Sequence, residues 1–71
     1  MTKLREKFIT ENLNKWVKLI FKNGYQLRCK IISYDDEEMV VATNVYSTDD
    51  TTMHNILVSY SAVAIYIPSI S

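Results

Sequence analysis

The sequence is poor in cysteine and glycine, which many small proteins use for disulfide bonds and for ligand-binding loops. It contains one cysteine and one glycine, which excludes both an intrachain disulfide and a glycine-rich phosphate-binding loop. No apolar run approaches the roughly 20 residues that cross a bilayer, and no basic start followed by an apolar stretch of signal length is present. We therefore expect a cytoplasmic protein in a reducing compartment.

Length and composition predict one folded domain over residues 1–71, since 48% hydrophobic residues are too many for a disordered chain. A chain of this size buries only about 60% of its unfolded surface and is marginally stable unless something supports it. Because no disulfide can do so, self-association is the expected support.

Positive charge is missing from the second half of the chain. All eight Lys and Arg residues lie in 1–34, whereas 35–71 hold six acids and no Lys or Arg, so a net charge of zero hides a strong asymmetry. Solvated strand faces with acidic loops would explain this division, and so would a surface that binds an anion. The composition leaves both explanations open.

An Asn-Gly pair predicts a β-hairpin within residues 16–34. A two-residue loop would pair Ile20 with Leu27 and send one strand's apolar side chains to solvent. A three-residue loop instead pairs Leu19 with Leu27, which keeps the apolar sets on one face and places Gly24 in the left-handed conformation. We expect the three-residue loop.

This register also predicts the other face of the hairpin. That face should carry four cations, one amide and one aliphatic side chain, namely Lys18, Ile20, Lys22, Gln26, Arg28 and Lys30. The hairpin thus has a side to bury and a basic side suited to an anion.

The rest of the chain predicts a helix and three more short strands. The expected elements are a helix over 3–14 with Thr2 as its N-cap, a turn at 35–38, strands over 39–43, 53–58 and 64–67, an exposed loop over 44–52 and a tight corner at 59–61. This order predicts a mainly β fold, in which the helix caps a strongly bent, five-stranded antiparallel barrel. The last two strands carry no cation to protect their edges, which favours edge-to-edge pairing between copies into a ring.

Two motifs resemble a known family. The segment Phe-Lys-Asn-Gly-Tyr-Gln-Leu at 21–27 and the Ser-Tyr-Asp at 33–35 are similar to the central pattern of bacterial Hfq, within the Sm-like (Lsm) superfamily. The helix before them and the last strand reaching Pro68 also match. The resemblance implies an Sm-like ring, usually a homohexamer, that binds single-stranded RNA and acts as an RNA chaperone in post-transcriptional regulation.

The resemblance also implies a site on the distal face of the ring, which binds adenine-rich RNA. The matching positions are Ile20, Gly24, Tyr25, Gln26, Leu27 and Arg28, and the cations beside them are Lys18, Lys22 and Lys30. The pore-side site departs from the family, because Tyr60 and Ser61 replace its Lys-His pair and Arg5 stands for its helix Gln. We expect the pore side to be a poor copy of the usual RNA site.

No enzyme is expected. His54 and Cys29 have no partners nearby in the sequence for a metal, cofactor or nucleophilic site, and the acidic turns lack calcium-loop spacing. Trp16 is assigned to core or helix packing. Two functions stay open: an RNA-binding ring that works through its distal face, and an Sm-like ring that recruits proteins with weak or no RNA binding.

Overall fold

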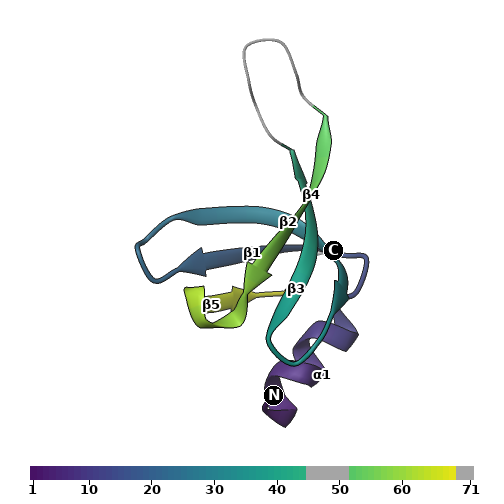
Figure 1. Cartoon of the computed structure of the whole chain (residues 1–71), viewed down its shortest axis with the longest axis vertical. Coiled ribbons are helices and arrows are strands. Elements are labelled where there is room, and N and C mark those ends of the chain that lie inside the picture. Colours follow the sequence, from purple (N-terminus) through teal and green to yellow (C-terminus); the bar gives the residue numbers. More distant parts are fainter. Residues whose placement is uncertain (45–51, 69–71) are drawn as a thin grey trace.

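One helix precedes five antiparallel strands in the computed structural model, which describes residues 1–44 and 52–68 (Figure 1). The elements are α1 (Lys3–Glu11), β1 (Trp16–Phe21), β2 (Gln26–Tyr34), β3 (Glu38–Asn44), β4 (Met53–Ser59), the single-turn 3-10 helix η1 (Tyr60–Ala62) and β5 (Val63–Ile67). Each predicted element is present, with ends that differ by a few residues. Asn44 ends β3 rather than opening a loop, and positions 45–51 of the predicted loop lie outside the described residues.

The ends of α1 follow from local hydrogen bonds. Thr2 is the predicted N-cap, since its hydroxyl accepts a hydrogen bond from the Arg5 N–H at 3.2 Å. The helix ends earlier than expected, at Glu11, and Asn12 caps it with a non-helical φ of −115°. The Asn12 side chain donates a further hydrogen bond to the Phe8 carbonyl at 2.8 Å. Asn14 then takes a φ of 60°, which turns the chain into β1.

The predicted hairpin register is confirmed. Leu19 pairs with Leu27, and the turn closes through a hydrogen bond from the Gly24 N–H to the Phe21 carbonyl at 2.9 Å. Gly24 has a φ of +89°, and a Cβ built there would meet no atom within 4 Å. Glycine is therefore favoured here by its backbone conformation and not by lack of space.

The five strands form one sheet in the order β4-β3-β2-β1-β5. β2 joins its two halves, because it pairs with β1 from Gln26 to Lys30 and with β3 from Lys30 to Tyr34, with a bulge between Ile31 and Ser33. Figure 1 shows β3 and β4 running across the direction of β1 and β5.

The five antiparallel strands are confirmed, and the strongly bent sheet is not closed, so that it leaves an edge at each end of the strand order. β5 pairs only with β1 and β4 only with β3, so within the described residues both strands leave one edge unpaired. The reason is geometric: β5 has five residues, and β4 follows β3 through seven paired positions instead of curving toward β5.

The core lies on the inner face of this bend. Its fully buried side chains are Ile9, Leu19, Cys29, Ile31, Met39 and Val41. From α1, Ile9 enters this core and the Phe8 ring packs edge-on against Tyr66, with 5.6 Å between centroids. α1 therefore covers one end of the sheet.

Replacement of Leu19 by alanine tests this core. Leu19 is 0% exposed, so Leu19→Ala should lower the free energy of unfolding by about 2–5 kcal/mol through lost burial and a cavity. The matched control is Leu4→Ala, since Leu4 is 82% exposed and its truncation should change stability by no more than about 0.5 kcal/mol. Urea unfolding followed by circular dichroism measures both, and equal losses would contradict the assigned register.

Candidate nucleic-acid interface

The outer face of the hairpin carries a row of polar and cationic side chains. The register places Trp16 opposite Lys30, Lys18 opposite Arg28 and Ile20 opposite Gln26, and directly paired side chains lie on the same side of a sheet. We call these six residues the basic face. Lys18, Gln26 and Arg28 are exposed, and Trp16, Ile20 and Lys30 are half-buried.

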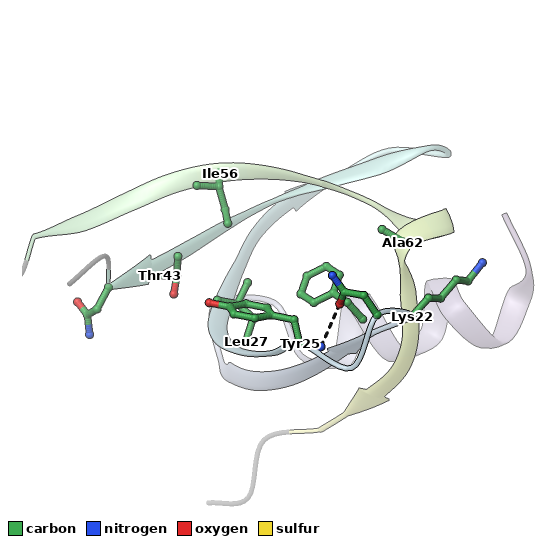
Figure 2. A pocket seen from close by; sticks show the side chains of 9 residues that line it. Lys22, Tyr25, Leu27, Thr43, Ile56 and Ala62 are labelled. Atoms are coloured by element: carbon green, nitrogen blue, oxygen red, sulfur yellow. Dashed lines mark hydrogen bonds between the residues drawn. The ribbon is translucent and has the colours of Figure 1, made fainter. Parts of the chain in front are cut away.

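Lys22 lies beyond the last pair of β1 and β2, so the register does not include it in the basic face. It begins the turn, and its N–H donates to the Ala62 carbonyl at 3.0 Å. Figure 2 shows its side chain pointing away from Tyr25 and Leu27. Its expected place beside the other cations stays a prediction.

Trp16 is the residue of the basic face that sequence reasoning missed. The structure places it beside two cations, with the Arg28 Cζ 5.9 Å and the Lys30 Nζ 5.7 Å from the centre of its ring. Its neighbour Val17 is 2% exposed and points into the core. Strand alternation could have placed it, because Trp16 lies two residues before Lys18 and four before Ile20, and every second residue of a strand lies on the same face.

Apolar side chains from β5 border the basic face. Ile67 pairs with Lys18 and Ile65 with Ile20, so both lie on the same side of the sheet as the cations. Ile65 is 51% exposed, which is high for such a side chain. The outer surface thus changes from cationic over β1 and β2 to apolar at the β5 edge.

Two hollows meet at this face. One, of about 520 Å³, lies between the cations and the end of β5 and includes Lys18 and Ile67 in its lining. The other, of about 410 Å³, lies along β2 and reaches Thr43, whose hydroxyl donates to the Arg28 carbonyl at 3.0 Å. Trp16, Gln26 and Arg28 line both hollows. These three residues therefore stand between two adjoining spaces.

A third, apolar hollow of about 660 Å³ lies on the inner side of the hairpin (Figure 2). Tyr25 and Leu27 face Ile56 of β4 across it, and the Tyr25 ring tilts against Phe21 with 6.0 Å between centroids. Tyr25 is 61% exposed. The expected distal-face residues are thus divided, with Tyr25 and Leu27 on the inner side of β2 and Gln26 and Arg28 on its outer side.

Of the three expected pore-side residues, Arg5 lies in α1, and Tyr60 and Ser61 lie in η1. Tyr60 is only 3% exposed, its hydroxyl donates to the Asp35 carbonyl at 2.8 Å, and the Arg5 Cζ lies 4.7 Å from the centre of its ring. Ser61 is exposed, and its hydroxyl lies 2.9 Å from that of Ser59. Tyr60 therefore ties η1 to the acidic turn and has little surface to offer a ligand.

Burial and hydrogen bonds shift the pKa values of Cys29 and Asp35. Burial raises the pKa of the Cys29 thiol to about 11, so the thiol is neutral at ordinary pH. Backbone N–H groups of Glu37 and Glu38 donate to the Asp35 carboxylate at 2.8 and 2.9 Å and lower its pKa.

Within residues 1–44 and 52–68, no three His, Cys, Asp or Glu residues are grouped to hold a metal ion. No helix in this part of the chain is long and apolar enough to span a membrane.

Comparisons with family models, curated proteins and solved structures find no match. The Hfq-like resemblance consequently rests on the motifs at 21–27 and 33–35 and on the order of the elements.

The buried Tyr60 hydroxyl predicts an alkaline loss of stability. Burial raises the pKa of Tyr60 from 10.0 to about 12, so its contribution is present below pH 10 and is lost as the pH rises through 12. Tyr60→Phe should lower the free energy of unfolding at pH 7 by about 1–2 kcal/mol, because the Asp35 carbonyl loses its donor. The variant should also lose less stability than the parent between pH 10 and 12.

The matched control is Tyr25→Phe, which removes a hydroxyl from a residue that is 61% exposed and should change the stability at pH 7 by no more than about 0.5 kcal/mol. Urea titrations at a series of pH values measure these quantities. An identical alkaline slope in the parent and Tyr60→Phe would contradict the assigned role of the Tyr60 hydroxyl.

Proposed function

We propose that this chain is the subunit of an Hfq-like ring that binds single-stranded, adenine-rich RNA on its basic face and acts as an RNA chaperone in post-transcriptional regulation. The observation that carries the proposal is the basic face itself, a rigid two-stranded surface with three cations, an amide and an indole ring.

The cations of the basic face are available to phosphates. In the described part of the chain, no ion pair joins Lys18, Arg28 or Lys30 to a carboxylate. Each cation that neutralises a phosphate releases counterions, so affinity should fall with rising salt. A ring would repeat the same set in every subunit, which turns a modest local charge into a continuous basic track.

Planar side chains near the cations suit unpaired bases. Aromatic side chains stack bases of any sequence, and the basic face carries the Trp16 ring, which lies beside Arg28 and Lys30. The Gln26 amide can both donate and accept, which is the pattern that the adenine N6 and N7 atoms complement. These features favour single-stranded RNA over a duplex, in which the base faces are already stacked.

The open edges of the sheet support assembly. The two unpaired edges belong to β4 and β5, which contain no Lys or Arg, and each carries an exposed apolar side chain, Leu57 at 62% and Ile65 at 51%. Pairing β4 of one copy with β5 of the next would continue the sheet and bury both residues. Such a contact is heterologous, so repetition closes a ring when the rotation permits.

Binding of oligo-A and oligo-U RNA across a salt series tests RNA recognition. Oligo-A should bind at low salt and weaken steeply as salt rises, and Arg28→Glu should reduce its affinity at least roughly tenfold and flatten the salt dependence. Lys7→Glu makes the same kind of charge reversal on the exposed surface of α1 and should bind like the parent. Fluorescence anisotropy of labelled RNA measures all three proteins.

If neither homopolymer binds at low salt, RNA recognition is wrong and the alternative becomes the better proposal. In that alternative the ring is a scaffold for protein partners, and the apolar hollow around Tyr25 and Ile56 would be the surface to examine first.

The edge-pairing proposal predicts a concentration-dependent assembly with a mass several times that of the 8.3 kDa chain. Leu57→Lys should shift this assembly toward the single chain, because a lysine on an edge strand opposes pairing. Leu4→Lys places the same change on an exposed helix position and should leave the mass unaltered. Native mass spectrometry measures all three, and a monomeric parent at micromolar concentration would contradict the ring.

A further inference from the structure

Trp16 combines three properties that single out one point on the basic face. It is half-buried, so part of the indole is fixed against the sheet while part remains at the surface. It is the aromatic member of the basic face, and it lines both hollows that meet there. Its position is set by the strand, since Val17 and Leu19 on either side of Lys18 are fully packed in the core.

Two cations lie near this ring and near each other. The Arg28 Cζ and Lys30 Nζ are 5.9 and 5.7 Å from the ring centroid, close to the outer limit of about 6 Å for a cation–π contact. Both positive charges lie on one strand, two residues apart, and point to the same side. A ligand that offers a flat apolar face to the indole and a negative charge to this pair would satisfy the whole group.

We propose that Trp16, Arg28 and Lys30 form a binding site for one nucleotide unit of single-stranded RNA, in which the base stacks on the indole and the adjoining phosphate meets the two cations. The inference rests on the proposed function and adds the residues that hold a particular nucleotide. A base would stack at roughly 3.5 Å from the ring, which is closer than Arg28 now lies. Arg28 is exposed on a flexible stem, so it can move from the ring to the phosphate, while Lys30 is half-buried and stays.

The shape of the surface favours a strand over a free nucleotide. Trp16 stands between the hollows of about 410 and 520 Å³, and each is large enough for further nucleotide atoms. A polynucleotide that stacks one base on Trp16 can therefore continue in both directions, toward Thr43 on one side and toward Ile67 on the other. A site for a free mononucleotide would need only one enclosed space.

Trp16 is the only tryptophan of the chain, so its emission reports directly on this site. Oligo-A RNA added to the unmodified protein should quench and shift the emission, with a midpoint equal to that of binding measured by anisotropy of labelled RNA. Adenosine monophosphate should produce a similar quench only at much higher concentration, because it lacks the neighbouring contacts. Comparable quenching by both at equal concentration would overturn the preference for a strand.

Two substitutions separate stacking from simple packing. Trp16→Leu keeps an apolar side chain but has no ring face, and it should weaken oligo-A binding about tenfold. Trp16→Phe retains a ring and should bind within a few-fold of the parent. Urea midpoints of both variants establish that they are folded.

The possible failures are distinguishable. RNA binding by anisotropy without a change in Trp16 emission, together with parental affinity of Trp16→Leu, would overturn this inference and leave the proposed function standing. No RNA binding, with quenching by adenosine monophosphate alone, would support a nucleotide site at Trp16 but overturn the proposed function. No response to either ligand would overturn both.

Discussion

The pairing of Leu19 with Leu27 is the constraint on which the rest of the structure depends. A strand alternates its side chains between two faces, so one pairing decides the direction of every residue in β1 and β2. The bulged turn at Gly24 fixes that pairing. On one side it gathers the aliphatic residues that the helix and β3 cover. On the other it leaves cations, an amide and an indole together on a surface that is held rigid by the core beneath it.

The second organising feature is that the two parts of β2 pair with different strands. Its first part belongs to the hairpin that carries the basic face, and its second part pairs with β3, with the bulge between Ile31 and Ser33 separating them. A small protein without disulfides thereby wraps a sheet around its core instead of stacking two sheets. The same curvature leaves the outer edges of β4 and β5 unpaired at opposite ends of the strand order. The bend that encloses the core therefore also produces the edges that suit self-association.

Much of this arrangement was predictable because it depends on local rules. The hairpin register followed from Asn23-Gly24 and strand alternation, the N-cap from Thr2, and the exposed edges from the absence of cations after residue 34. Trp16 was assigned to packing because it opens the first strand, next to the helix, although strand alternation places it on the same face as Lys18. How far the sheet curves toward closure depends on twist and strand length across the whole sheet, which a pattern of apolar residues does not specify. The roles of the basic face and of Tyr60 and Arg5 in RNA binding stay predictions.

The strand order also has a consequence for how the chain reaches its final form. The β1–β2 and β3–β4 pairings join neighbours in sequence, whereas β5 must bring Tyr66 back to Leu19 from the far end of the chain. Contacts between distant segments cost more loop-closure entropy and form later. β5 is therefore expected to dock last during folding and to fray first on mild destabilisation. The outer edge of β5 is one half of the expected subunit contact. Association with a neighbour would therefore stabilise the strand that is least stable in the isolated chain.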